Sequence, residues 1–188
     1  MSQHDDFVLT TPRLLLRQWQ EADAAPFAAL TADAEVMRHF PTVLSRKQSD
    51  ELLALLQEGI SKRGWGFWAV EKRNTKECIG FTGLNPAVNT PYPDAVEVGW
   101  RLSRDHWGNG YAPEAAKHSL RFAFDKLELP EVVACTTREN FASQRVMQKI
   151  GMRNCHENFK HPKVDPDSPL SEHLLYRITR EEFESISP

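Results

Sequence analysis

The spacing of apolar residues divides the chain into helix-like and strand-like segments. Apolar residues at steps of three and four indicate one face of a helix, whereas short runs rich in β-branched and aromatic residues indicate strands. On this basis we expect helices over residues 21–31, 33–39, 45–64, 113–127 and 140–151. We expect strands over residues 7–19, 65–72, 77–85, 95–102, 131–137 and 172–179.

Short signals mark several of the boundaries between these segments. Ser45 and Gln48 have the spacing of a capping box at the start of the third helix, and Gly151 suits the end of the last one. Residues 73–76 read as a hairpin turn, and 159–170 as a long loop. The order of elements predicts a single α/β domain, residues 1–188, with a mixed sheet and a strand–helix–strand–helix unit at its centre.

Residues 104–120, RDHWGNGYAPEAAKHSL, contain a Gly-Asn-Gly sequence followed at once by a proline and a glutamate. An Asn-Gly pair is the strongest short signal of a β-hairpin, but a hairpin needs a strand on each side. Downstream, apolar residues recur at helical spacing, while Pro113 suits a first helical position and Glu114 the positive end of the helix dipole. We therefore predict a strand, a glycine loop and a helix start, whose free N–H groups bind an anion.

The motifs of other phosphate-binding loops fit this stretch poorly. A Walker-A loop is excluded because no Gly-Lys-Ser/Thr follows the glycines. Gly108 and Gly110 could begin a dinucleotide fingerprint, but Pro113 occupies its third glycine position. Glu128 lies about where the ribose-binding acid is expected, yet at the end of the helix and not at the tip of the next strand.

The composition narrows the class of protein without naming the anion. Of 188 residues, 40% are hydrophobic and 26% charged, and the net charge of −3 gives no basic field for nucleic acid. The sequence shows no apolar run of 18 residues and no signal-peptide pattern, so we expect a cytoplasmic protein without a membrane span. Cys78, Cys135 and Cys155 read as reduced thiols, and no Cys/His spacing suggests a metal site.

The stretch EVGWRLSRDHWGNGYAPEA, residues 97–115, resembles the acetyl-CoA-binding strand, loop and helix start of the GNAT acyltransferase superfamily. The pyrophosphate motif of that superfamily, Gln/Arg-x-x-Gly-x-Gly/Ala, falls on residues 107–112, where Trp107 departs from it and matches the RimJ/RimL-like branch. TPRLLLR at 11–17 and ENFASQRVMQKIGM at 139–152 resemble the same branch. The resemblance implies an acetyl-CoA-dependent N-acetyltransferase with a mixed, mostly antiparallel twisted sheet of about seven strands and flanking helices.

The resemblance also implies which residues bind the coenzyme. The pyrophosphate would lie on the loop amides and the pantetheine in a splay between the fourth and fifth strands, pairing with the backbone of strand 98–102 and with Asn140. Physical reasoning agrees for the loop, because a side chain at its glycines would hold the backbone away from a phosphate. The coenzyme-binding residues expected are Trp100, Leu102, Trp107, Gly108, Asn109, Gly110, Tyr111, Ala112 and Asn140.

Two residues are candidates for the chemistry, each with a structural alternative. Glu97 is the candidate base, with Asp94 a lesser one; the alternative is a solvated glutamate satisfied by a neighbour such as Arg101. Many GNAT enzymes carry a tyrosine as the thiolate acid where this chain has Met147, so Ser143 takes that role in the branch it resembles. Ser143 could instead bond local backbone in a first helical turn, and Asn140 could be only an N-cap.

The chain also contains candidate residues for binding the acceptor of the acetyl group. Trp65, His161 and Tyr176 are candidate acceptor contacts, although aromatic residues at strand spacing are more often core. The acceptor expected is a primary amine, either a protein N-terminal α-amine or a small-molecule amine. The oligomeric state stays open, with a homodimer as one alternative, and a non-catalytic CoA-binding sensor of the same fold is the alternative function.

Overall fold

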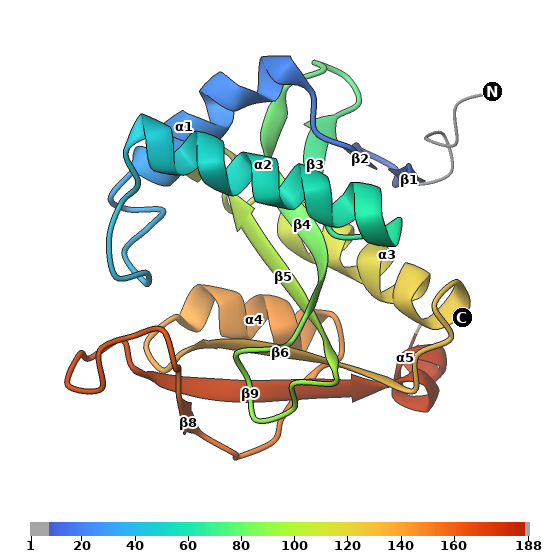
Figure 1. Cartoon of the computed structure of the whole chain (residues 1–188). Helices are drawn as coiled ribbons and strands as arrows, with labels where there is room; N and C mark the ends of the chain where they lie inside the picture. Colours follow the sequence, from blue (N-terminus) through green and yellow to red (C-terminus); the bar gives the residue numbers. More distant parts are fainter. Residues whose placement is uncertain (1–7, 187–188) are drawn as a thin grey trace. The chain divides into compact units, whose positions relative to one another are not determined.

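The computed structural model describes residues 8–186 and shows a nine-stranded sheet with helices (Figure 1). The strand order is β1-β2-β3-β4-β5-β6-β9-β7, and β8 pairs with β9 off this path. By its internal contacts the chain forms two compact units. Unit 1 comprises Met1–Gly83 and Gly99–Ser119, and unit 2 comprises Leu84–Val98 and Leu120–Pro188. The prediction of a mixed, mostly antiparallel α/β sheet is confirmed.

The strands of unit 1 form an antiparallel series. They are β1 (Leu9–Thr10), β2 (Leu14–Arg17), β3 (Phe67–Lys72), the first part of β4 (Cys78–Pro86) and the end of β5 (Val96–Leu102). The single strand expected over 7–19 is wrong. A turn at Pro12 separates β1 from β2, which pair with each other, because proline cannot donate to a strand ladder.

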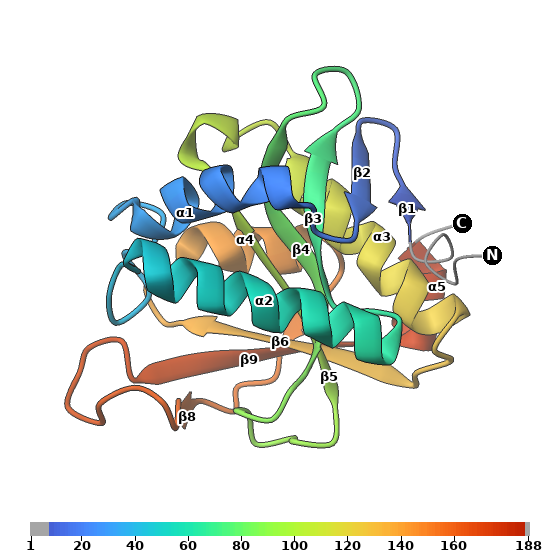
Figure 2. The ribbon, with the colours of Figure 1, turned by 45° about the horizontal axis from the view of Figure 1, so that its top comes forward.

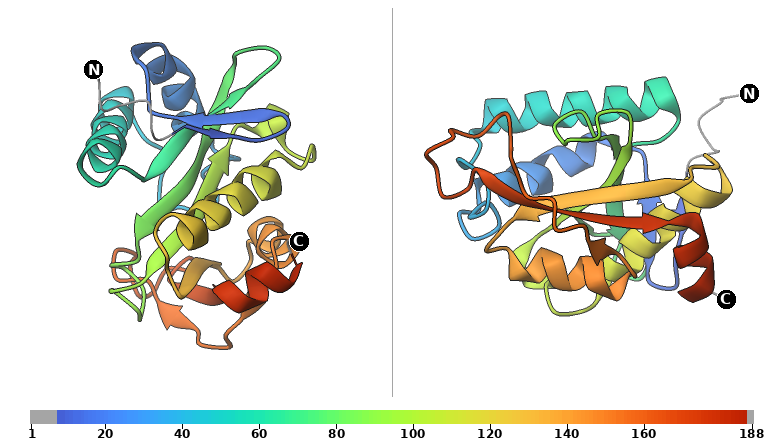
Figure 3. Two further views of the ribbon diagram at one scale, coloured as in Figure 1. Left: turned by 90° about the vertical axis from the view of Figure 1, so that its right-hand side faces the viewer. Right: turned by 90° about the horizontal axis from the view of Figure 1, so that it is seen from below.

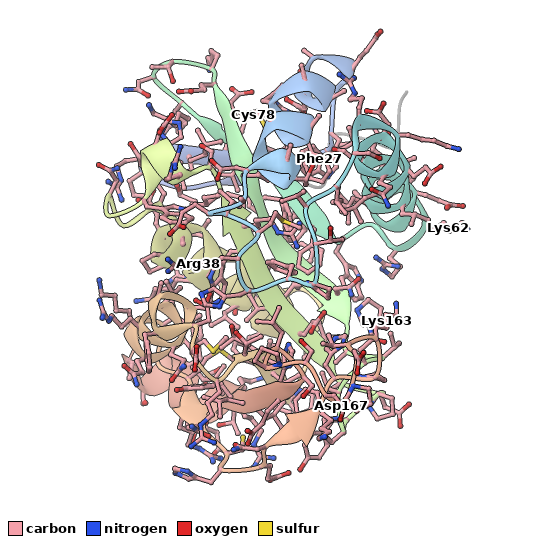
Figure 4. The ribbon with its side chains drawn as sticks, turned by 90° about the vertical axis from the view of Figure 1, so that its left-hand side faces the viewer. Phe27, Arg38, Lys62, Cys78, Lys163 and Asp167 are labelled. Carbon is pink, nitrogen blue, oxygen red and sulfur yellow. The ribbon has the colours of Figure 1, made fainter. Side chains whose placement is uncertain are left out.

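Two helices, α1 (Ala24–Ala32) and α2 (Arg46–Arg63), lie over the β2–β4 strands of unit 1 (Figure 2). The capping box of α2 is confirmed, with Ser45 accepting from the amide of Gln48 and Gln48 accepting in return. Leu53 and Ile60 are buried on the inner face of α2, while Lys62 extends into solvent (Figure 4). This alternation is the amphipathic pattern that predicted the helix.

A helix over 33–39 is not observed, and this expectation is wrong. Residues 34–39 form turns, and the Asp33 Oδ1 accepts hydrogen bonds from the amides of Glu35 and Val36 at 2.8 and 3.3 Å. Such side-chain-to-backbone bonds compete with a regular helix.

The glycine loop leads into helix α3 (Tyr111–Asp125), after a short 3-10 helix η3 (Arg104–His106). The β-hairpin alternative is therefore wrong. The helix begins two residues earlier than expected, so Pro113 is its third residue, where the missing N–H still has no intrahelical partner to lose.

Unit 2 is built on the long antiparallel pair of β6 (Glu131–Thr137) and β9 (Glu172–Thr179), which Figure 3 shows side by side. The start of β5 joins β6 in parallel at Glu97↔Val133. Helices α4 (Phe141–Lys149) and α5 (Arg180–Ile186) complete the unit. The short strands β7 (Arg153–Asn154) and β8 (Phe159–Lys160) both pair with β9. No helix within residues 8–186 is long and apolar enough to cross a membrane.

Candidate active site

The glycine loop, in unit 1, has the backbone conformation that its sequence predicted. Gly108 and Gly110 have φ of +76° and +78°, a region that side chains other than glycine rarely adopt. The Asn109 side chain closes the loop on itself by donating to the carbonyl oxygens of His106 and Trp107 at 3.2 and 3.0 Å. The first amides of α3, at Tyr111 and Ala112, follow directly and have no residue four positions earlier in the helix to bond.

Trp107, which departs from the superfamily motif, anchors the loop to the preceding strand. Its Nε1 donates to the carbonyl oxygen of Leu102, the last residue of β5, at 2.8 Å. Trp107 as a whole residue is 42% exposed. Leu102 itself is buried and Trp100 is half-buried, and their coenzyme contacts stay predictions.

A set of contacts that the sequence did not predict fixes the start of α3. The Glu114 carboxylate accepts from the Thr11 hydroxyl at 2.6 Å and from the Arg13 amide and Nε at 3.0 and 2.6 Å. Arg13 also donates from Nη1 to the Asn109 carbonyl oxygen at 2.9 Å, and its guanidinium lies 4.5 Å from the Tyr111 ring centroid. Burial would raise the pKa of Glu114, but these hydrogen bonds outweigh it and hold that pKa below its usual value. The TPR of residues 11–13 marked this segment by its resemblance, but nothing in it pointed to Glu114.

Glu97, in unit 2, carries a half-buried carboxylate without a cationic partner among residues 8–186. Its Oε1 accepts from the Asn85 Nδ2 at 3.3 Å, and the Cys135 Sγ lies 4.0 Å from Oε2. Burial raises the pKa of Glu97 above its usual value, although the Asn85 hydrogen bond lowers it in part. Asp94, the lesser candidate, is exposed.

The neighbouring thiol is not a competitor for the chemistry. Burial, together with the charge of Glu97, raises the pKa of Cys135 to about 12. The thiolate form is therefore scarce at neutral pH, and the partly buried side chain packs against the core cluster of Ala87, Val133 and Leu175.

Asn140 and Ser143 lie together at the start of α4. Asn140 is the N-cap of the helix, and its Oδ1 accepts from the Ser143 amide at 3.2 Å. The Ser143 hydroxyl makes no hydrogen bond to any residue between 8 and 186, so it is not engaged with local backbone. Met147 is buried, with 2% of its surface exposed, and packs as a core residue. The coenzyme and acid roles of Asn140 and Ser143 stay predictions.

The three candidate acceptor contacts lie in different surroundings. Trp65, in unit 1, is half-buried with the Arg63 guanidinium 5.1 Å from its ring centroid. Tyr176 is buried on β9, and its hydroxyl donates to the Gln144 Oε1 at 3.4 Å. His161 lies at the start of the loop that carries Lys163 and Asp167 (Figure 4).

The His161 ring packs against that of His173, with centroids 4.8 Å apart. Burial lowers the pKa of both rings, and repulsion from His173 and Lys163 lowers that of His161 further. Both rings are therefore neutral at physiological pH.

Comparison with known proteins gives one consistent result. A model of the acetyltransferase (GNAT) domain family matches residues 13–153. The uncharacterized N-acetyltransferase YoaA of Bacillus subtilis is 34% identical over 152 residues, covering 78% of this chain and 82% of YoaA. The FsC-acetyl coenzyme A-N(2)-transacetylase of Aspergillus fumigatus is 34% identical over 134 residues, covering 69% of this chain and 56% of that protein.

A solved structure supports the fold independently of these sequences. The GNAT-family acetyltransferase of Bacillus anthracis superposes with a TM-score of 0.77 at 24% identity, covering 93% of this chain and 99% of that one. The region matched by the family model contains the glycine loop and the Arg13 side chain that tethers it by hydrogen bonds. It also contains Glu97, Asn140 and Ser143. The chain therefore belongs to the acetyltransferase (GNAT) domain family, and it is an N-acetyltransferase.

Proposed function

We propose that the protein transfers the acetyl group of acetyl-CoA to a primary amine, by direct attack of the amine within a ternary complex. Acetyl-CoA supplies the acetyl group as a thioester, and the protein must bind the coenzyme, accept a proton from the amine and help the thiolate leave. The proposal assigns these three tasks to the glycine loop, to Glu97 and to Ser143.

The observation that carries the proposal is the state of Glu97. A carboxylate held in a salt bridge is a weak base, whereas among residues 8–186 Glu97 has only neutral donors, the Asn85 amide and the Cys135 thiol, and a pKa raised by burial. A raised pKa brings a carboxyl group closer to the pKa at which a general base is effective near neutral pH. Glu97 therefore accepts the proton of the attacking ammonium group, directly or through one water.

The glycine loop and Ser143 complete the proposed chemistry. The loop amides and the dipole of α3 bind the pyrophosphate, with the dipole adding about 0.3–1 kcal/mol to the hydrogen bonds. The Ser143 hydroxyl has no partner among residues 8–186, so it is free to donate to the departing sulfur. Asn140 would bond the pantetheine amide through its side-chain nitrogen while its oxygen caps α4.

The acceptor class is proposed from a relative's name and from the sequence segments that resemble one branch of the superfamily. A similar protein is named as an acetyl coenzyme A-N(2)-transacetylase, which agrees with acetyl transfer to nitrogen. Trp107 and the TPRLLLR and ENFASQRVMQKIGM segments support placement in the RimJ/RimL-like branch. The acceptor proposed is a protein N-terminal α-amine or a small-molecule amine.

The test is release of free thiol when the protein is mixed with acetyl-CoA and a panel of primary amines. We expect thiol release that depends on the amine and that falls strongly in Glu97→Gln. Tight binding of acetyl-CoA with no turnover on any amine would instead support the non-catalytic sensor.

A further inference from the structure

Arg101 is a half-buried cation in unit 1, and no carboxylate among residues 8–186 forms a salt bridge with it. It lies near the end of β5, with its guanidinium carbon 4.0 Å from the ring centroid of Phe40 and 5.3 Å from that of Phe81. Its Nε is buried and donates no hydrogen bond, and no carboxylate pairs with Arg101 among residues 8–186. Two aromatic rings are the contacts that the structure gives to its charge.

The same unit contains an arginine that shows the contrast. Arg17 donates from Nε to Glu71 at 2.7 Å, and from Nη1 and Nη2 to Asp23 at 2.7 and 3.0 Å. A buried guanidinium is tolerated when its fork of donors is satisfied in this way. Burial lowers the pKa of Arg101 to about 10, which still leaves it charged at neutral pH. The edge of Arg101 is therefore an unsatisfied cationic donor.

The geometry decides what kind of group can satisfy Arg101. Phe40 and Phe81 both contact the guanidinium, while Nε, which forms one edge of the group with the adjacent Nη, has no hydrogen-bond partner among residues 8–186. That edge presents two parallel N–H groups, which match the two oxygens of a carboxylate. Phe40 is 38% exposed, so the ring over the guanidinium borders solvent, and a small ligand reaches the buried Nε when Phe40 moves aside.

The surroundings place Arg101 on the α1 side of the strands and separate it from the glycine loop. Alternation along β5 puts Gly99 on the same face as Arg101, and a Cβ at Gly99 would lie 3.0 Å from the Phe67 ring. Phe67 and Phe81 pack with centroids 5.1 Å apart, and Phe81 lies 6.2 Å from Phe27 of α1. A ligand here is held by side chains of β3, β4, β5 and the turn after α1, and not by the amides at the start of α3.

We propose that Arg101 binds a carboxylate carried by the acceptor, so that the preferred substrates are small amines that also bear a carboxylate group. This rests on the proposed acetyl transfer, because it assigns the bound carboxylate to the molecule that receives the acetyl group. Arg101 is then a specificity-determining residue, and Phe40 positions its guanidinium.

The kinetic test uses pairs of acceptors that carry either a carboxylate or an uncharged carboxamide, compared at equal concentrations of the unprotonated amine. The acceptors are glycine, 3-aminopropionate, 4-aminobutyrate and 6-aminohexanoate, each compared with its carboxamide. We expect the parent protein to prefer at least one carboxylate over its amide by about tenfold or more in kcat/KM. Arg101→Met should lose that preference while its rate on the amides changes little, and Arg101→Lys should keep only part of it because it lacks the two-donor edge. Arg46→Met, which removes an exposed charge from α2, should retain the full preference.

A binding measurement separates this proposal from the acetyl-transfer function. Calorimetric titration of propionate and propionamide into each protein requires no turnover. Carboxylate-selective binding by the parent that Arg101→Met abolishes supports the site even if no acetyl transfer occurs. Acetyl transfer without a carboxylate preference, or a preference that survives in folded Arg101→Met, overturns the site and leaves the acetyl-transfer function intact. Thermal unfolding of each variant establishes that it is folded.

Discussion

Glu97 acts, in our proposal, on an acceptor whose basicity determines how much a base is needed. An α-amine with a pKa near 8 is about 10% neutral at pH 7, whereas an alkyl amine near 10.4 is about 0.04% neutral. The gap of about 2.4 pKa units corresponds to roughly 3.3 kcal/mol, which the base and the site must offset for the alkyl amine. The role of Glu97 should therefore depend on the acceptor.

We expect Glu97→Gln to slow transfer to an alkyl amine by about 10²-fold or more at neutral pH. The loss should be several-fold smaller with a peptide α-amine. Only the ionised carboxylate accepts a proton, so kcat/KM of the parent should rise as the pH increases through the raised pKa of Glu97. This rise should be missing in the variant. Raising the pH further should recover much of the loss, since the amine then deprotonates in solution.

The measurement is kcat/KM against pH for both proteins and both acceptor types. A deficit that is independent of pH and of acceptor basicity would show that Glu97 orients the acceptor or the strand and is not the base.

Ser143 allows a second test at a single atom. Because its hydroxyl makes no hydrogen bond to the rest of residues 8–186, Ser143→Ala should leave stability nearly unchanged. We expect it to lower kcat by up to about 10²-fold with little change in KM for acetyl-CoA, and Ser143→Thr to restore part of the loss. Equal turnover in Ser143→Ala and the parent would leave water as the proton donor.

At the scale of the element, the glycine loop depends on backbone conformation more than on space. A Cβ at Gly110 would come no closer than 3.5 Å to another group, the Arg13 Nη2, so crowding is mild. Its φ of +78° is the obstacle, because a left-handed conformation disfavours side chains by about 1–2 kcal/mol and a β-branched residue most of all.

We expect Gly110→Val to raise KM for acetyl-CoA about tenfold or more, because the loop would leave the conformation that presents its amides. Gly64→Val is the matched control, since Gly64 has a φ of +79° at the end of α2. It should lower the thermal midpoint comparably and leave KM for acetyl-CoA unchanged. Similar KM values for all three proteins would remove the loop from the coenzyme site.

The elements that the sequence predicted are those with a long periodic pattern or a local end signal. Helix α2 has both, and its capping box is formed as expected. Strands β7 and β8 are two residues long, too short for any alternation to show, and they form because β9 offers partners. The glycine loop was predictable because its residues are contiguous. The tether of Glu114 to Thr11 and Arg13 was not, because more than 100 positions separate Glu114 from each of them.

At the scale of the whole molecule, the Arg17 network is the clearest source of electrostatic stability. Arg17, Asp23 and Glu71 bury their charged groups together in unit 1. Burial alone would raise the pKa of Asp23, but hydrogen bonds from Arg17 and the Gln20 amide outweigh it and lower that pKa. Since the pKa is lower in the folded state, this stabilisation is present above about pH 4 and is lost as the pH falls further.

We expect Arg17→Met to reduce the free energy of unfolding by about 3–5 kcal/mol at pH 7, because it leaves two buried carboxylates without their partner. The difference from the parent should shrink toward pH 3, because the pKa of Asp23 is lowered in the folded parent and its stabilisation is lost as the pH falls. Urea unfolding at both pH values measures it, with Arg46→Met as the exposed-pair control, expected to change stability by less than about 1 kcal/mol. A deficit that stays constant with pH would assign the effect to packing.

The hydrogen bonds that join Glu114 to the Thr11–Arg13 turn couple coenzyme binding to the stability of the segment that they close. If acetyl-CoA binds best to the tethered loop, then by linkage the bound coenzyme stabilises closure of the whole segment between Arg13 and Glu114. At a concentration of 100 Kd this amounts to about 2.7 kcal/mol. Amide hydrogen exchange at Arg13 and Leu14, remote in sequence from the glycine loop, would then slow on saturation with coenzyme. The N-terminal turn thereby reports occupancy of an anion site to which it contributes no phosphate-binding amide.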